Sequence, residues 1–324
     1  MRIALDAMGG ERAPQVVVQG AVVAVEEQGV DVVLVGRRDA IEAELAKYGR
    51  ALPIADASEV IELGDHPMES VRHKKDSSIV VGINLVKQGE ADAFVSAGNT
   101  GAVMASATFT LKRIEGIDRP ALGVLVVLPW HSLMLLDVGA NPDCKPFQLV
   151  QFARMGSLYM ERIFKVKNPK IGLLSNGEEE SKGNLLVRET HKLLKESGLN
   201  FIGNVEGNDI AGDKVDVMVT DGFTGNVVLK AGEGIGEMVF MSLRQAITAK
   251  PHIKLIGFLL QRQLRGAIQA LDYAEHGGAT LLGVNGNVII AHGRSEAKAI
   301  KNAIYFAKRA AEQHIVDAIR TGIT

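Results

Sequence analysis

One segment of the chain has the composition of an anion-binding loop. Residues 96–102 read Ser-Ala-Gly-Asn-Thr-Gly-Ala, between an expected strand at 93–96 and an expected helix at 100–112. Glycines let the backbone approach a ligand closely, and a helix N-terminus presents free N–H groups to a negative charge. The segment matches neither a Walker A loop nor G-x-G-x-x-G, so it predicts an anion without naming a nucleotide. A tight turn with an Asn or Thr cap explains the same residues equally well.

A second loop, residues 174–184, contains three consecutive glutamates and a lysine between a strand and a helix. The glutamates suit the first turn of a helix, where the helix dipole favours negative charge. Lys182 falls about one turn into the helix expected at 179–195. From that position its side chain is expected to lean back over the strand ends, where a positive charge would meet an anionic reactant.

A third loop, residues 220–226, has glycines on both sides of Phe223 and precedes a long expected helix. The glycines predict a bent loop in which Asn226 can donate to an oxyanion; an Asx-type helix cap is the alternative. Three more glycine-containing polar loops follow strands, at 6–10, 137–141 and 204–207. In open α/β sheets ligands gather outside the carboxyl ends of strands, so these loops favour an active site there. The candidate substrate-site residues of these loops are Asp6, Gly9, Gly10, Asn141, Asn176, Glu206 and Asp221.

Other reactive side chains carry weaker signals. Cys144 has no evident base partner, so we expect a buried or bystander thiol. The basic run 72–75 can receive phosphate or an acidic protein partner, although a solvated charge run is the simpler explanation. His131 and His292 lack ligand-type spacing, and neither zinc-site nor serine-hydrolase motifs occur. The positions of these loops thus favour an active site at the strand ends without identifying a reaction.

The elements that must position these loops alternate between apolar runs and amphipathic stretches. Expected strands lie at 3–6, 32–35, 59–63, 93–96, 122–128, 133–138, 171–175, 201–205, 215–219 and 288–291. Expected helices lie at 13–28, 39–48, 78–87, 100–112, 146–164, 179–195, 226–246, 253–271 and 295–320. Alternation of this kind predicts a three-layer α/β/α fold with a mostly parallel sheet. The run 121–138 predicts a hairpin, which makes the sheet mixed.

The composition limits the classes of protein to which the chain can belong. The chain has 324 residues, 47% hydrophobic and 23% charged, with a formal net charge of −2 and one cysteine. These values exclude a mainly disordered chain, a global pull toward nucleic acid and an intrachain disulfide, and they fit a reducing cytosol. We expect neither a signal peptide nor a transmembrane helix.

We expect one continuous body over residues 1–324, with a helical insertion at 245–275. From residue 244 to residue 271 the charged residues are all basic. A helix at 253–271 would place Ile256, Leu260 and Leu264 on an apolar face and Arg262 and Arg265 on the polar face. Such a helix fits either an anionic membrane surface or a partner subunit.

Multi-residue blocks along the chain carry a family resemblance. The blocks are DAMGG (6–10), SAGNTGA (96–102), IDRPAL (117–122), LLDVGAN (135–141), DCKP (143–146), GEEESKGN (177–184), FIGNVEG (201–207), DGFTGNVVLK (221–230) and GVNG (283–286). In this order, from about residue 1 to about residue 305, they resemble the PlsX family, the phosphate acyltransferases of bacterial phospholipid synthesis.

The resemblance implies transfer of a fatty acyl group from acyl carrier protein to inorganic phosphate, which gives acyl phosphate. It implies a fold similar to the isocitrate/isopropylmalate dehydrogenase and phosphotransacetylase group. It further implies a homodimer without a redox cofactor, peripheral at the inner face of the membrane and supplying a membrane acyltransferase. On this basis Gly98, Asn99, Thr100 and Gly101 are expected to bind phosphate, and Lys182 and Asn226 to stabilise the oxyanion. An acyl-CoA-dependent phosphotransacetylase, a non-catalytic scaffold and a nicotinamide dehydrogenase are the alternatives.

Overall fold

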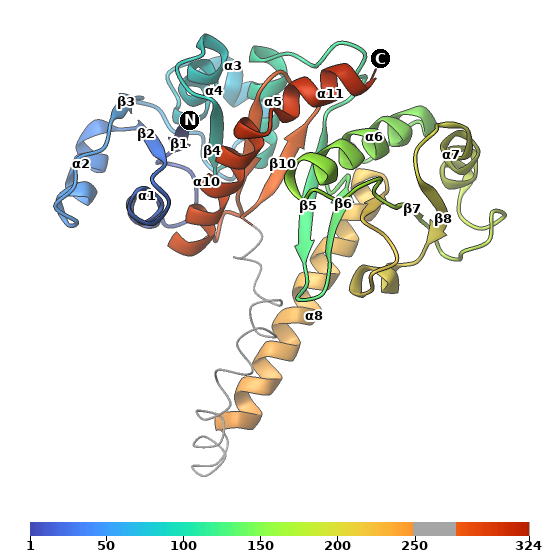
Figure 1. The fold of residues 1–324 in the computed structure, drawn as a ribbon. Coiled ribbons are helices and arrows are strands. Elements are labelled where there is room, and N and C mark those ends of the chain that lie inside the picture. Colours follow the sequence, from blue (N-terminus) through green and yellow to red (C-terminus); the bar gives the residue numbers. More distant parts are fainter. Residues whose placement is uncertain (249–276, 324) are drawn as a thin grey trace.

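A mixed sheet of 11 strands forms the centre of the molecule (Figure 1). The structure is a computed structural model, and it describes residues 1–248 and 277–323. The strands are β1 (Arg2–Asp6), β2 (Asp31–Gly36), β3 (Ile54–Asp56), β4 (Ala93–Ser96), β5 (Ala121–Val127), β6 (Ser132–Leu136), β7 (Ile171–Leu174), β8 (Phe201–Val205), β9 (Val217–Val219), β10 (Ala279–Leu282) and β11 (Asn287–Ile290). Their order across the sheet is β3-β2-β1-β4-β11-β10-β5-β6-β9-β7-β8.

The sheet contains two sets of parallel strands that run in opposite directions. β1 to β4 and β11 form the first set, and β6 to β9 form the second. Between them, β10 pairs antiparallel with β11 and with β5, and β5 pairs antiparallel with β6. Three successive reversals leave the sets antiparallel to each other. The register nevertheless brings the carboxyl ends of β11 and β6 into one row, because Ile290 pairs with Ala279, Ala279 with Val124, and Val124 with Leu135. The loops that follow these two strands therefore lie close together.

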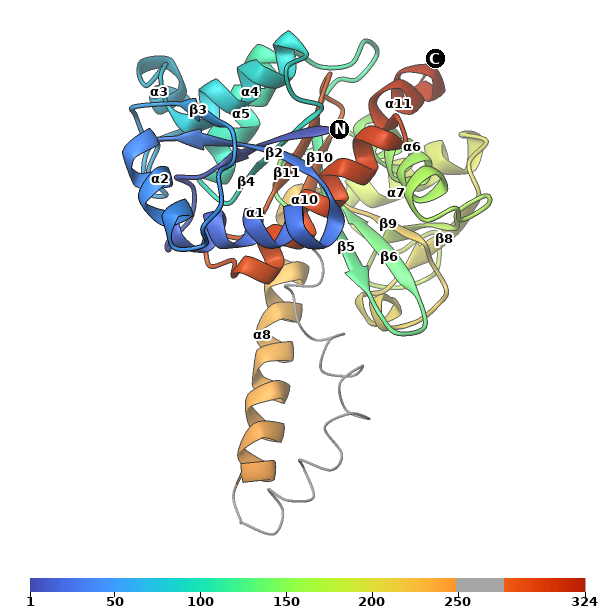
Figure 2. The same cartoon turned by 60° about the vertical axis from the view of Figure 1, so that its left-hand side comes forward.

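Helices cover both faces of the sheet. They are α1 (Gln15–Gln28), α2 (Arg38–Ala46), α3 (Pro67–His73), α4 (Ser78–Gln88), α5 (Thr100–Thr110), α6 (Pro146–Ile163), α7 (Leu185–Glu196), α8 (Gly222–Thr248), α10 (Ala297–Glu312), α11 (Ile315–Ile323) and the short 3₁₀ helix η1 (Gly207–Ala211). Buried side chains of α3, α4 and α5, together with the start of α8, pack on one face. On the other face, α1, α2 and α10 cover the first set of strands, and α6, α7 and α11 cover the second (Figure 2). The expected three-layer α/β/α architecture with a mostly parallel sheet is confirmed.

The hairpin is also confirmed, because β5 and β6 pair antiparallel and Leu128 and His131 exchange backbone hydrogen bonds at their turn. The expected strand at 59–63 is wrong: this stretch is a loop with one isolated bridge, from Glu59 to Ser77. The expected helix at 295–320 is two helices, α10 and α11, which meet near His314 at a positive φ of 51°. The sequence did not reveal β3, β10 or α3.

α8 extends well beyond the sheet (Figure 2). Its 27 residues begin against the strands, and its far part carries exposed apolar side chains, among them Ile235, Met238 and Met241. No helix within residues 1–248 and 277–323 is long and apolar enough to cross a membrane. The insertion expected at 245–275 starts inside α8, and the rest of it lies outside the described residues. The membrane candidates Ile256, Leu260, Arg262, Leu264 and Arg265 lie there too.

Candidate functional site

Asp6, at the end of β1, joins two of the predicted loops. Its carboxylate accepts the N–H of Met8 at 3.0 Å and the hydroxyl of Ser96 at 2.6 Å. Ser96 in turn accepts the N–H of Gly98 at 3.0 Å, so the loops after β1 and β4 share one network. Burial raises the pKa of Asp6, and the hydrogen bond from Ser96 opposes that rise. Asp6 is 1% exposed, so its role is to hold the loops in place.

The glycines of these loops allow close packing of protein against protein. A Cβ on Gly9 would lie 2.4 Å from the Asp6 carboxylate and 2.7 Å from the Gly98 nitrogen. A Cβ on Gly98 would face Ser96 and Asp6, and one on Gly101 would lie 2.6 Å from Pro67. Gly10 has a φ of +113°, a conformation that glycine adopts without strain. Packing against protein atoms therefore explains the glycines at 98 and 101, and phosphate binding by this loop stays a prediction.

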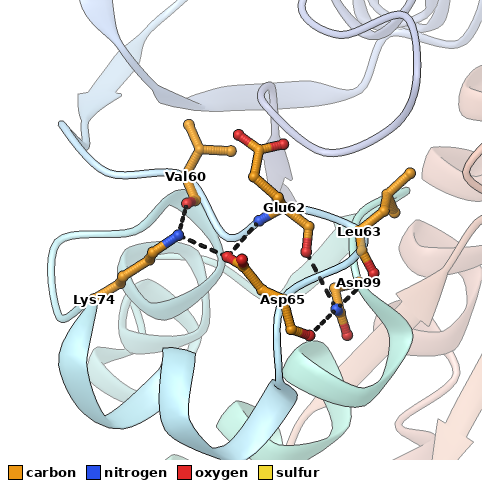
Figure 3. Close-up of polar contacts among 6 residues, drawn as sticks. All are labelled: Val60, Glu62, Leu63, Asp65, Lys74 and Asn99. Carbon is orange, nitrogen blue, oxygen red and sulfur yellow. Dashed lines mark hydrogen bonds and ion pairs between the residues drawn. The ribbon is translucent and has the colours of Figure 1, made fainter.

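Asn99 connects the start of α5 to the loop 62–65 (Figure 3). Its Oδ1 accepts the N–H of Ala102 at 3.0 Å, which caps the helix. Its Nδ2 donates toward the carbonyls of Glu62, Leu63 and Asp65 at 3.0–3.2 Å. The side-chain donors of Asn99 are thus committed to backbone carbonyls, and the donors left for an anion are backbone N–H groups. Those of Thr100 and Gly101 have no hydrogen-bond partner among the described residues.

Lys74 holds the same loop from its other side (Figure 3). Its ammonium donates to the Val60 carbonyl at 2.7 Å and to the Asp65 carboxylate at 2.6 Å. The hydrogen bond from Lys74 lowers the pKa of Asp65. One lysine of the basic run 72–75 therefore has a structural role.

A second group of predicted residues gathers at the end of β6 and the start of α8. The buried carboxylate of Asp137 accepts the N–H groups of Leu122, Gly139, Ala140 and Asn141 and the side-chain amide of Asn141. Burial raises the pKa of Asp137, against these hydrogen bonds. Gly222, at the start of α8, packs beside it, because a Cβ there would lie 2.9 Å from Asp137 Oδ2.

Asp221 and Asn226 lie in this second group. Asp221 accepts the N–H and the hydroxyl of Thr224, both at 2.8 Å, and so caps α8. Asn226 is exposed, and its Nδ2 donates to the Val138 carbonyl at 3.1 Å. An amide nitrogen has two hydrogens, so one remains for a ligand.

Lys182 lies in the loop before α7, and the expectation that it sits inside the helix is wrong. Asn184 caps α7 by accepting the N–H of Val187 at 3.0 Å, so the helix begins at Leu185. Gly183 has a φ of +89°, which is not helical, so the helix does not extend back to Lys182. The Lys182 side chain is exposed and makes no hydrogen bond or ion pair with any described residue. Asn176 braces the same loop, because its Oδ1 accepts the N–H of Gly183 at 2.9 Å.

Glu206 follows β8 and begins η1, where its N–H donates to Asp209 at 2.8 Å. No described hydrogen bond joins Lys182, Asn176 or Glu206 to Asn226. The loops of the second set nonetheless share one sheet edge, since β6, β9, β7 and β8 are parallel.

α8 connects this edge to the loops of the first set. One turn after Asn226, the Lys230 ammonium approaches Nε2 of His292 to 3.3 Å. His292 follows β11, beside the Ser96 loop, because the N–H of Ala291 donates to the Ser96 carbonyl at 2.8 Å. Sequence reasoning set His292 aside and gave Lys230 no role. The signal available was the four-residue spacing from Asn226 to Lys230, which places both on one helix face.

Cys144 is not an available nucleophile. Burial, followed by the charge of Asp137, raises its pKa to about 12. Its thiol donates to the Asn141 carbonyl at 3.3 Å. For chemistry on an anion, the loops described above offer amide donors and the ammonium groups of Lys182 and Lys230.

The chain resembles known proteins in sequence over almost its whole length. The model of a family described as fatty acid synthesis protein matches residues 1–318. A phosphate acyltransferase of Pelotomaculum thermopropionicum is 49% identical over 325 aligned positions, covering 100% of this chain and 95% of the relative. A phosphate acyltransferase of Desulfitobacterium hafniense is 50% identical, covering 99% and 97%.

Solved structures share the fold at low sequence identity. A phosphotransacetylase from Streptococcus pyogenes aligns with a TM-score of 0.66 and 18% identity, covering 96% of this chain and 94% of that one. A 4-hydroxythreonine-4-phosphate dehydrogenase from Klebsiella pneumoniae aligns with a TM-score of 0.55 and 12% identity, covering 96% and 99%.

Proposed function

The chain belongs to the phosphate acyltransferase family of fatty acid and phospholipid synthesis, and from this premise we propose that it moves a fatty acyl group from acyl carrier protein to inorganic phosphate. A phosphate oxygen forms a bond to the thioester carbonyl carbon, the carbon–sulfur bond breaks, and the thiol of the carrier leaves. The products are acyl phosphate and free carrier. The observation that carries the proposal is identity of about half over essentially the whole chain with relatives named for this activity.

The residues suit this reaction. Phosphate is already anionic at neutral pH and needs no strong base, and a thiolate leaves with little help from an acid. The barrier lies in bringing two reactants together and in stabilising the tetrahedral oxyanion, which positioned donors achieve. A site without an activated cysteine, in which the pKa of Cys144 is about 12, is consistent with direct attack by phosphate.

We assign phosphate to the loop 98–101 and the oxyanion to Lys182 and Asn226. The unpaired N–H groups of Thr100 and Gly101 at the start of α5 support the first assignment. The ammonium of Lys182, which has no partner among the described residues, and the second amide hydrogen of Asn226 support the other. In this proposal Gly98 and Asn99 shape the phosphate loop, and Asp6, Gly9 and Gly10 support it from β1.

The deciding experiment uses the purified protein with acyl carrier thioester, with and without inorganic phosphate. Phosphate-dependent loss of thioester and formation of acyl phosphate are expected. A parallel reaction with acyl-CoA tests the alternative donor, which presents the same pantetheine thioester. Thioester loss that does not depend on phosphate contradicts the proposal.

We further propose a homodimer that rests on the inner face of the membrane through residues 253–271 and hands acyl phosphate to a membrane acyltransferase. Exposed apolar side chains on the described part of α8 support an apolar contact at this end: Ile235 is 58% exposed and Met238 61%. Leu260→Glu is expected to abolish sedimentation with anionic liposomes and to keep the dimer and the phosphate-dependent activity. A variant that becomes monomeric favours subunit packing, and one that still binds liposomes rejects the anchor.

A further inference from the structure

Lys230 and His292 come from different halves of the molecule and meet at the phosphate loop. Lys230 lies on α8, which follows β9 of the second set of strands, and His292 follows β11 of the first. Their side-chain nitrogens are 3.3 Å apart. No charge or motif in the sequence brings these two residues together; the path of α8 across the sheet does.

The imidazole of His292 faces a donor on each side. Its Nδ1 is 3.2 Å from the backbone N–H of Arg294, and its Nε2 faces the ammonium of Lys230. A neutral imidazole accepts a hydrogen bond at one nitrogen only, and a protonated one accepts none. Both donors are therefore never satisfied by the ring at once. An acceptor of negative charge placed beside Lys230 and Nε2 resolves the conflict, because it takes a hydrogen bond from each.

The charges around the pair favour such an acceptor. Burial, and then the positive charge of Lys230, lowers the pKa of His292. Arg294 adds to this effect, whereas Glu233 and Glu11 oppose it. Lys230 is paired with Glu233 at 2.8 Å on its own helix, an exposed contact that an incoming anion can replace.

The pair also lies next to the loops assigned to phosphate. A Cβ on Gly10 would lie 3.3 Å from the Gly293 carbonyl and 3.4 Å from Ala97, so the loops after β1, β4 and β11 touch one another. The N–H of Glu11 donates to the same Gly293 carbonyl at 2.9 Å. His292 is thus one residue from a backbone that packs directly on the segment 96–102.

We propose that Lys230 and His292 together contact the anionic phosphate group of the acceptor and of the acyl phosphate product. The inference rests on the proposed function and adds two contact residues that the loop motifs do not include. Lys230 donates throughout, and His292 donates from Nε2 when the bound anion favours its protonated form. α8 thereby places one phosphate contact, Lys230, one turn from the oxyanion donor Asn226.

The test compares Lys230→Met, Lys230→Arg and His292→Gln in steady-state kinetics with phosphate and acyl donor varied separately. Lys230→Met is expected to raise KM for phosphate about tenfold or more, the scale of a lost charged hydrogen bond, with KM for the acyl donor nearly unchanged. Lys230→Arg is expected to recover part of the loss. The control is Lys47→Met, which removes a lysine that is also three residues from its paired glutamate, Glu44, and that caps the C-terminus of α2.

A second readout needs no turnover. The His292 ring signal in NMR, assigned with His292→Gln, is followed against pH with and without inorganic phosphate. Phosphate is expected to raise the pKa of His292, because a nearby anion favours the charged ring; Lys230→Met is expected to raise it without phosphate, because a repelling charge is gone. If Lys230→Met does not fold, the wild-type titration and Lys230→Arg decide.

The outcomes separate the two claims. The inference is overturned, and the proposed function stands, if the wild type is active but two results are negative. These are an unchanged KM for phosphate in Lys230→Met and a His292 NMR signal that does not change when phosphate is added. Wild type that is inactive with acyl donors, but whose His292 signal responds to phosphate, rejects the proposed function and keeps the anion site.

Discussion

Replacing Asn99 by alanine is expected to destabilise the protein by about 3 kcal/mol and to release the loop 62–65 from α5. The side chain does two things: it caps α5 through Ala102, and it donates to three carbonyls of that loop (Figure 3). Loss of an Asn cap costs about 1 kcal/mol. An amide nitrogen has two hydrogens for the three carbonyls, so about two bonds of roughly 1 kcal/mol each are lost as well.

The matched control is Asn184→Ala. Asn184 caps α7 with the same geometry, a 3.0 Å bond from Val187, and makes no other side-chain hydrogen bond among the described residues. It should therefore cost only about 1 kcal/mol. Asn99→Asp is expected to keep the cap and lose the loop, because a carboxylate oxygen then faces the three carbonyls.

Urea unfolding measures the free energies, and hydrogen exchange of the amides in 60–65 measures the release of the loop. Exchange there is expected to rise in Asn99→Ala and Asn99→Asp and to stay unchanged in Asn184→Ala, with no phosphate present. The reasoning is refuted if Asn99→Ala costs no more than Asn184→Ala and leaves exchange in 60–65 as in wild type. Direct phosphate binding by the Asn99 side chain would then be the better account.

Three other perturbations follow from the same geometry. Lys182→Ala should keep its circular dichroism spectrum and lose about 100- to 1000-fold in turnover, and near wild-type turnover removes Lys182 from the site. Gly9→Ala places a Cβ 2.4 Å from the Asp6 carboxylate and should destabilise the protein by about 1–3 kcal/mol in urea unfolding. The control is Gly232→Ala, whose Cβ meets nothing within 4 Å and should not destabilise the protein. Equal urea midpoints for the two variants contradict the packing explanation. Cys144, with a pKa of about 12, stays protonated at pH 8, so its alkylation should be about 1000-fold slower than that of an ordinary thiol. Rapid labelling of Cys144 in the folded protein contradicts its burial.

The sequence predicted those elements correctly whose ends depend on neighbouring residues. The strand at 93–96 and the start of α5 were predicted correctly, because a buried apolar run ends at an Asn that caps the next helix. The hairpin of β5 and β6 was equally readable, since four residues separate two apolar runs. These features depend on neighbours in the sequence, and no distant contact competes with them.

The misassigned strand at 59–63 shows what sequence periodicity omits. Its residues, Glu-Val-Ile-Glu-Leu, form a short apolar run that suits a strand, but side chains from elsewhere occupy its carbonyls. Lys74 takes the carbonyl of Val60, and Asn99 takes those of Glu62 and Leu63. Asn99 is 37 residues from Glu62, so no local pattern reveals the competition.

The arrangement of the candidate site was hidden for a topological reason. The loops were all correctly read as following strands, but the two sets of strands run in opposite directions. The reversal depends on β10, four residues long, which pairs with both β11 and β5. So short a run, followed by Gly283, does not stand out from a turn. Without β10 the sequence does not show that the carboxyl ends of β11 and β6 meet in one row of the sheet.

α8 contacts the loops that follow both sets of strands. Near its start, Asn226 bonds to the loop after β6, and one turn later Lys230 meets His292 beside the phosphate loop. The same continuous helix runs to residue 248 and exposes apolar side chains such as Met238 at its far part. In the proposed reaction, the first set of loops holds phosphate and Asn226 contacts the thioester, so the two sets of loops must keep a fixed arrangement. Since α8 carries both Asn226 and Lys230, the proposed membrane contact at its far end would also orient these two donors.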